Sequence, residues 1–167
     1  MNDERWLWPY FRDAIRVLRP RYAIIENVPG LLTSDDGRAF NRVLSDLAAL
    51  GYDAEWAVLP ASFVGAPQTR ERLFIVSYPA EINGVTRNML GESEERITQV
   101  PIGGLFSLAL VAGWEPSDFW AGGEPAVAPL VDGTPRVLAE SSACGNAVVP
   151  QVAEYVGRCV MLHANEK

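Results

Sequence analysis

Residues 22–30 have the sequence Tyr-Ala-Ile-Ile-Glu-Asn-Val-Pro-Gly, in which a short apolar run ends abruptly in a carboxylate, an amide and a turn. The run from Tyr22 to Ile25 is rich in β-forming residues and lacks alternating polar residues, which is typical of a strand covered on both faces in a parallel sheet. Apolar residues at helical spacing precede it, namely Leu7, Phe11, Ala14, Ile15 and Leu18. Pro20 ends that pattern, so the sequence predicts a helix followed by a buried strand.

The same two periodicities recur further along the chain. Apolar residues repeat at helical spacing within residues 40–47, and Gly51 marks the end of that helix. Residues 52–59 alternate between apolar and acidic positions, which predicts a more exposed strand, and residues 73–76 form a second apolar run. After a long Gly- and Pro-rich connection with one short strand or helix near 105–111, a helix begins at Pro150.

This order of elements predicts an α/β fold, with a partial Rossmann-like sheet that ends in a β-hairpin. We expect a small irregular insertion and a C-terminal helix that packs back on the sheet. Only three clear strands are present, fewer than a doubly wound sheet normally uses, so the chain is expected to form part of something larger.

Composition indicates a globular protein and excludes several functional classes. The 167 residues are 49% hydrophobic and carry a net charge of −7. There is no long apolar run or signal peptide, which argues against a membrane or secretory role. Two cysteines outside any CxxC pair and a single histidine argue against a structural metal site and fit a cytoplasmic compartment. A negative net charge usually opposes nucleic-acid binding. Residues 79–124, however, hold two arginines and seven acidic residues, so this segment accounts for −5 of the net charge of −7.

Three short segments could carry chemistry. Glu26 follows the first strand, where a partly desolvated carboxyl suits proton sharing, although it could equally cap the next helix or pair with an arginine. Arg70 and Arg72 enter the last strand, where guanidinium groups suit a phosphate or a base carbonyl, although a surface ion-pair cluster around Glu71 is the alternative. Residues 145–150 form a Gly-Asn turn into a helix, and its free N–H groups suit a small polar ligand.

Taken together, these segments resemble the cytosine-5 DNA methyltransferase family. The family has a Glu-Asn-Val segment, a Gln-x-Arg-x-Arg segment before an apolar strand and a Gly-Asn-x-Val-x-Pro helix start, in this order. Here they stand as Glu26-Asn27-Val28, Gln68-Thr69-Arg70-Glu71-Arg72 and Gly145-Asn146-Ala147-Val148-Val149-Pro150. The resemblance spans almost the whole chain.

The resemblance implies methyl transfer from S-adenosylmethionine to carbon 5 of a cytosine flipped out of double-stranded DNA, as in restriction–modification. In the family a cysteine thiolate adds to carbon 6. By this resemblance Glu26 would lie against N3 of the base, Arg72 would hold O2, and Arg70 would support the nucleophile loop or a nearby phosphate.

The resemblance also assigns supporting residues. Asn146 and Ala147 would line the methionine end of the cofactor pocket, whereas Asn27 and Gln68 would orient their loops. Residues 1–78 would be the C-terminal half of the catalytic domain, residues 79–140 a reduced target-recognition or linker region, and residues 141–167 the helix that completes the catalytic domain.

Two family motifs, the glycine-rich cofactor loop and the Pro-Cys nucleophile, do not occur in this sequence. Cys144 and Cys159 do not follow proline and are predicted to be small buried hydrophobes, and His163 is predicted to lie near a frayed terminus and to be inert. We therefore expect a fragment that is inactive alone and needs an N-terminal half, or self-association. The alternative is a non-catalytic remnant or interaction protein that keeps the fold.

Overall fold

The computed structural model describes residues 6–66, 69–80, 104–115 and 148–165. Within these ranges the elements, in chain order, are helix α1 (Trp8–Leu18), strand β1 (Ala23–Asn27), 3-10 helix η1 (Pro29–Leu32), helix α2 (Arg38–Ala49), strand β2 (Tyr52–Pro60), 3-10 helix η2 (Ala61–Val64), strand β3 (Glu71–Pro79), 3-10 helix η4 (Leu105–Ser107), and helices α3 (Leu108–Val111) and α5 (Pro150–Asn165). The mixed α/β class is confirmed. Residues 105–111, for which the sequence predicted either a short strand or a short helix, are helical.

Strand β3 is the centre of a three-stranded sheet with the order β1-β3-β2. It pairs antiparallel with both neighbours, so that Ile75 lies opposite Ile25 on β1 and opposite Trp56 on β2. Strands β2 and β3 form the predicted hairpin. Because β1 and β2 both run opposite to β3, they are parallel to each other, and α2 connects them through Gly51 at φ +81°, a conformation that favours glycine.

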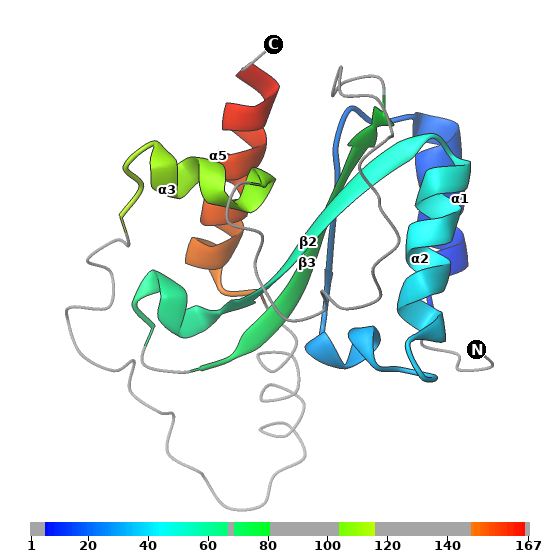
Figure 1. Ribbon diagram of the computed structural model, residues 1–167, viewed down its shortest axis with the longest axis horizontal. Coiled ribbons are helices and arrows are strands. Elements are labelled where there is room, and N and C mark those ends of the chain that lie inside the picture. Colours follow the sequence, from blue (N-terminus) through cyan, green and yellow to red (C-terminus); the bar gives the residue numbers. More distant parts are fainter. Residues whose placement is uncertain (1–5, 67–68, 81–103, 116–147, 166–167) are drawn as a thin grey trace, which may run out of the picture.

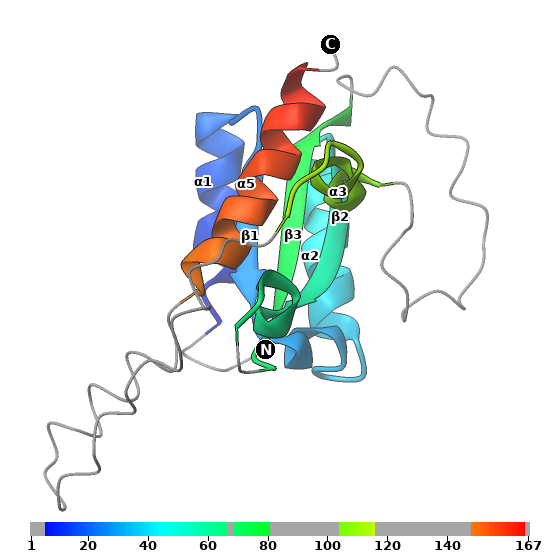
Figure 2. The same cartoon turned by 90° about the vertical axis from the view of Figure 1, so that its left-hand side faces the viewer.

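Helices cover both faces of this sheet, as Figures 1 and 2 show from two directions. On one face Leu73 and Ile75 of β3 pack with buried side chains of α1 and α2. On the other face Phe74, Val76 and Tyr78 pack with α5 and η4. Alternate residues of β3 therefore enter two cores, and each fully buried large side chain stabilises the fold by roughly 1.5–3 kcal/mol.

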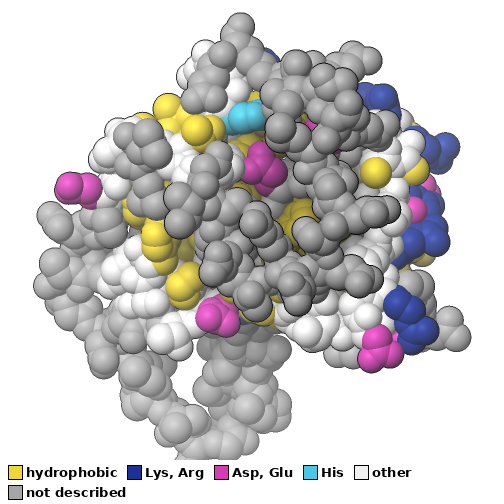
Figure 3. Space-filling view, in the orientation of Figure 1, with side chains coloured by type: hydrophobic (Ala, Val, Ile, Leu, Met, Phe, Trp, Pro, Cys, Tyr) yellow, Lys and Arg dark blue, Asp and Glu magenta, His cyan; other side chains and the backbone are white. Residues whose placement is uncertain are grey.

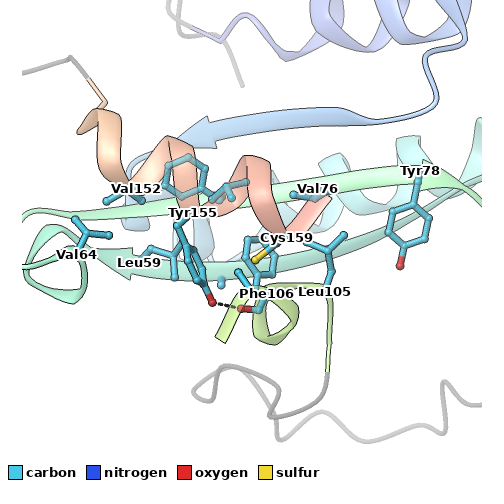
Figure 4. Close-up of a cluster of buried hydrophobic side chains, with 13 residues drawn as sticks. Leu59, Val64, Val76, Tyr78, Leu105, Phe106, Val152, Tyr155 and Cys159 are labelled. Atoms are coloured by element: carbon cyan, nitrogen blue, oxygen red, sulfur yellow. Dashed lines mark hydrogen bonds between the residues drawn. The ribbon is translucent and has the colours of Figure 1, made fainter. Parts of the chain in front are cut away.

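The second core joins segments that are far apart in the sequence. The hydroxyl of Tyr155 on α5 donates a hydrogen bond to the backbone carbonyl of Phe106, and both residues are almost fully buried (Figure 4). The carboxylate of Glu55 accepts the Tyr78 hydroxyl at 2.6 Å and the backbone N–H of Leu105 at 2.7 Å. These bonds fix the segment around η4 against α5 and the hairpin.

One expectation about β1 is wrong. Residues 22–25 are not a strand buried on both faces of a parallel sheet, because among the described strands β1 lies at the edge, antiparallel to β3, and Ile24 is 45% exposed. The core around α5 is built on side chains of β2 and β3. The face of β1 on which Ile24 lies is therefore only partly covered, whereas Ala23 and Ile25 are buried against the helices of the other face.

The helix predicted before β1 is confirmed as α1, but most of its apolar side chains lie outside the core. Among the large apolar residues whose spacing predicted the helix, only Ile15 is buried, and Trp8 is buried as well. Leu7 is 65% exposed and Leu18 is 74% exposed. The helix is apolar around about half of its circumference and uses only one margin of that half to contact the sheet and α2.

The described ranges hold neither a membrane-spanning helix nor a cluster of metal ligands. No helix there is long and apolar enough to span a bilayer. Nor does that part of the chain bring three His, Cys, Asp or Glu side chains together as ligands for a metal ion.

Candidate active site at one end of the sheet

Glu26, near the end of β1, and Arg72, near the start of β3, form an ion pair. The sheet register puts Glu26 opposite Phe74, so that Arg72 is its diagonal neighbour across the two strands. Nε of Arg72 lies 2.8 Å from Oε1 of Glu26, and the side chains are 15% and 29% exposed, respectively. The sequence position left open whether Glu26 shares a proton, caps the next helix or pairs with an arginine, and the structure shows the pairing with an arginine.

Two interactions of Arg72 argue against an ion-pair cluster centred on Glu71. Besides the contact with Glu26, Nη1 of Arg72 donates to the backbone carbonyl of Glu71 at 2.8 Å. The Glu71 side chain itself is exposed. The contacts with Glu26 and with the Glu71 carbonyl therefore hold the guanidinium at the end of the sheet and fix its direction.

Asn27 shapes the turn that follows Glu26. Its Oδ1 accepts a hydrogen bond from the backbone N–H of Val28 at 2.8 Å, immediately before η1 begins at Pro29. Val28, the N-terminal cap of η1, makes no side-chain capping bond. The side chain of Asn27 thus supports the main chain that leaves β1, an arrangement suited to orienting the loop.

Arg70 is half-buried and lies directly before β3. Its backbone carbonyl accepts the N–H of Ala61 at 2.8 Å, which closes the hairpin end of β2 and β3. Gln68, the other residue predicted in this loop, lies outside the described residues.

The start of α5 lies at the same end of the sheet as the Glu26–Arg72 pair (Figure 1). Val148 and Val149 pack against the core beneath α5, and Val152 lies in that core with Val64 of η2 (Figure 4). The predicted cofactor residues Asn146 and Ala147 precede this helix and lie outside the described residues. The described parts of all three sequence segments are therefore brought to one end of the sheet.

One side chain at the start of α5 was missed by sequence reasoning. Oε1 of Gln151 is buried, and within the described ranges nothing donates a hydrogen bond to it. A buried acceptor of this kind suits an N–H donor such as the ammonium group of a methionine moiety. The residues at this end of the sheet fit one edge of an S-adenosylmethionine pocket, whereas the family's glycine-rich loop is not among the 167 residues.

The cysteine that the structure describes is not suited to act as a nucleophile. Cys159 is fully buried on the inner side of α5, and this burial raises the pKa of its thiol above the usual value. The prediction that it is a small buried hydrophobe is confirmed. Cys144 lies outside the described residues.

His163 was expected near a frayed helix end, and that expectation is wrong. Helix α5 continues to Asn165, and His163 is only 9% exposed. Its Nδ1 lies 2.8 Å from the hydroxyl oxygen of Tyr22, and its ring packs 4.7 Å from that of Tyr78. Tyr22 precedes β1, so this aromatic cluster stands at the opposite end of the sheet from Glu26. No periodic pattern in the sequence could link residues so far apart in the chain.

The side of the molecule formed by α1 and α2 is rich in arginine, as the dark blue side chains of Figure 3 show. Several of these are matched by acids on the same surface: Arg38 pairs with Asp35, and Arg42 pairs with Asp46 at 3.0 Å. Such exposed pairs leave little net positive charge. They give no reason to assign a phosphate-binding surface to these helices.

Known proteins are similar to part of the chain. The model of a family described as C-5 cytosine-specific DNA methylase matches residues 1–102. The type II methyltransferase M.BsuFI of Bacillus subtilis is 40% identical over 73 residues, which cover 42% of this chain and 18% of the relative. M.BspRI of Lysinibacillus sphaericus is 34% identical over 84 residues, or 50% of this chain and 20% of that enzyme. The matches thus span about a fifth of the length of these curated relatives.

Proposed function

The chain belongs to the C-5 cytosine-specific DNA methylase family, and from this premise we propose that it takes part in the transfer of a methyl group from S-adenosylmethionine to carbon 5 of cytosine in double-stranded DNA. The ion pair between Glu26 and Arg72 carries the proposal, because it sets a carboxylate and a guanidinium side by side at the end of a sheet. Ligands of open α/β sheets bind at the ends of the strands.

The chemistry needs an acid and a cation at one edge of the base. Carbon 5 of cytosine is a weak nucleophile until a thiolate has added to carbon 6. We assign Glu26 to the N3 edge, where it shares a proton as the ring becomes electron-rich, and Arg72 to O2, where it stabilises the developing negative charge. Their mutual contact at 2.8 Å pre-orients both groups before a base flips into the site.

The other assigned residues support this pair. Asn27 holds the turn after β1 through its bond to Val28. Gln68 is assigned to orient the loop that enters β3, and Arg70 to support the nucleophile loop or a nearby phosphate. S-adenosylmethionine supplies an electrophilic methyl group when bound. Asn146, Ala147 and the buried amide oxygen of Gln151 would hold its methionine end.

The catalytic thiolate is assigned to a segment outside these 167 residues. No Pro-Cys dipeptide occurs in the sequence, and Cys159 is fully buried in a core. We propose that the chain acts together with a polypeptide segment that carries the glycine-rich loop and the Pro-Cys motif, and that residues 79–140 contribute the remaining DNA contacts.

Incorporation of labelled methyl groups into DNA tests the proposal. The chain alone is expected to incorporate none, and the chain mixed with M.BsuFI from which the matched segment has been deleted is expected to incorporate label at carbon 5 of cytosine. Glu26→Gln should slow this incorporation by about 100-fold or more, while the exposed control Glu154→Gln on α5 retains it. Incorporation by the chain alone, or full activity of Glu26→Gln, would disprove the assignment.

A further inference from the structure

Three aromatic rings from three separate segments meet beside the core around α5. Phe63 lies in η2, Trp114 follows α3, and Tyr155 lies in α5. The rings of Phe63 and Trp114 are stacked, with centroids 5.9 Å apart and an angle of 15° between their planes. Each of these two rings meets the ring of Tyr155 edge to face at a centroid distance of 4.9 Å. Both geometries are favourable for aromatic pairs, so the three rings form one cluster, which we call the aromatic junction.

The backbone after α3 directs Trp114 back onto this junction. Gly113 has φ +79°, a left-handed conformation that favours glycine and reverses the chain at a helix end. The backbone N–H of Trp114 then donates to the carbonyl of Ala109 at 2.8 Å, and Ala109 is 1% exposed. The position of the indole is therefore set by the main chain of its own segment.

Residues 104–115 are also held at their beginning. The backbone N–H of Leu105 donates to the Glu55 carboxylate at 2.7 Å. The next residue, Phe106, accepts the hydroxyl of Tyr155 at its backbone carbonyl (Figure 4). Because both bonds engage main-chain groups, the segment cannot slide along α5 without breaking them. Trp114 is thus joined firmly to the hairpin and to α5, and it can serve as a fixed support for Phe63.

Helix η2 lies in the connection from β2 to β3, which leads to the catalytic pair. At its first residue, the backbone N–H of Ala61 donates to the carbonyl of Arg70 at 2.8 Å. Strand β3 begins directly after Arg70, and Arg72 reaches Glu26 from the second position of this strand. A displacement of η2 would therefore move the backbone on which Arg72 is mounted.

Core filling alone does not account for the stacked pair. Val64 of η2 is fully buried in the core, whereas Phe63 and Trp114 are only partly buried at its margin. A contact that served only to remove apolar area from water would be enclosed more completely. Connections at the end of a sheet are more mobile than the strands that they join, so a stacked ring adds restraint where it is most needed.

We propose that Trp114 is a positioning residue of the candidate site. Stacked on Phe63, the indole holds η2 in place, and η2 in turn holds the start of β3, from which Arg72 reaches Glu26. This inference rests on the proposed function, because it gives Trp114 a part in the reaction assigned to that pair. The same stack joins the long connection between β3 and α5, to which we assign the remaining DNA contacts, to the arginines of the site.

Hydrogen exchange of the full chain alone gives the first test. The amide of Ala61, which is bonded to Arg70, reports local opening of the connection between β2 and β3. Trp114→Ala should speed its exchange by at least about tenfold, whereas Trp114→Phe, which keeps a ring for stacking, should stay within about threefold of wild type. Ile15→Ala destabilises the core on the other face of the sheet and is the control. It should leave the exchange of Ala61 unchanged.

Methyl transfer gives the second test, in a mixture of the full chain with M.BsuFI from which the matched segment has been deleted. Trp114→Ala should lower kcat by about tenfold and leave KM for plasmid DNA within about twofold, because a misdirected arginine slows the reaction rather than the binding of DNA. Phe63→Leu removes the other ring and should act alike. The double variant should be no slower than either single variant, since one contact is lost in all three.

Faster exchange of Ala61 together with a lower kcat in Trp114→Ala supports the inference. Unchanged exchange in Trp114→Ala, equal acceleration in Ile15→Ala, a raised KM with unchanged kcat, or additive losses in the double variant would overturn it. The exchange experiment uses neither DNA nor S-adenosylmethionine. A chain that shows the expected exchange but never methylates DNA would therefore refute the proposed function and leave the support of η2 by Trp114 standing.

Discussion

Nε of Arg72 contacts Oε1 of Glu26 at 2.8 Å, joining the start of β3 to the end of β1 across the sheet. The two side chains are partly exposed, so water screens the pair and its contribution to folding is small. The same contact fixes the direction of both functional groups, which matters far more for a reaction at their common edge. Stability and catalysis should therefore respond differently to its loss.

A double-mutant cycle with Glu26→Gln and Arg72→Gln separates the two effects. We expect a coupling free energy below about 1 kcal/mol in urea unfolding. In the reconstituted enzyme, Glu26→Gln alone should slow methyl transfer by about 100-fold or more, because it removes an acid–base group. A loss of stability as large as the loss of activity would show that the pair is structural.

The sequence patterns located most of the elements but not how they pair. The apolar run at Leu73–Val76 correctly predicted a buried strand, and the alternation after Gly51 correctly predicted its hairpin partner. The place of β1 could not be predicted in the same way, since pairing depends on residues distant in sequence. The composition of a run such as Tyr22 to Ile25 does not distinguish a central strand from an edge strand.

The carboxylate of Asp46 links α2 to α1. Its Oδ2 accepts the indole N–H of Trp8 at 2.9 Å and Nε of Arg42 at 3.0 Å. Burial alone would raise the pKa of Asp46, but these hydrogen bonds, with the charges of Arg42 and Arg12, outweigh it and hold the pKa below 3.8. The ionised carboxylate therefore stabilises the fold above pH 3.8, and that contribution disappears as the pH falls through the lowered pKa.

Asp46→Asn should lower the free energy of unfolding by about 1–2 kcal/mol at pH 7. The difference from wild type should shrink as the pH is lowered below 3.8, where wild type loses its own charge. Urea unfolding between pH 7 and pH 3 measures this trend. Asp13→Asn, at a 48% exposed side chain on α1, is the matched control and should change stability by less than about 0.5 kcal/mol. A difference between Asp46→Asn and wild type that grows at low pH would contradict the argument.

The thiol of Cys159 should be unreactive in the folded protein. It is fully buried, and burial raises its pKa, so little thiolate forms at neutral pH. In a Cys144→Ala background, a disulfide reagent at pH 8 should label Cys159 at least about 100-fold more slowly in the native protein than in urea. Rapid native labelling would place this thiol at the surface and reopen it as a nucleophile.

The sequence predicted which residues belong to the candidate site but not how they are arranged in space. The motifs singled out Glu26 and Arg72, whereas the antiparallel register that makes them diagonal neighbours came from the structure. Gln151 carries no signal of its own, because only folding shows that its amide oxygen is buried. His163 appeared to be terminal, and only the path of α5 brings it against Tyr22.

The hydroxyl of Tyr155 should matter for the docking of η4 on α5. Tyr155→Phe leaves the Phe106 carbonyl buried without this donor, which should cost about 1–3 kcal/mol of unfolding free energy. Tyr10→Phe removes a hydroxyl group at a 76% exposed position and should leave the free energy of unfolding unchanged. Equal effects in urea unfolding would show that the bond contributes nothing to stability.

Two residues of α1 distinguish the structure from the sequence pattern. Ile15 is 3% exposed and packs in the core with β1, so Ile15→Ala should cost about 2–4 kcal/mol in urea unfolding. Leu18 belongs to the same apolar half of the helix but is 74% exposed, so Leu18→Ala should change the stability of the chain alone by less than about 0.5 kcal/mol. A large effect of Leu18→Ala on the stability of the chain would show that α1 packs through its whole apolar half.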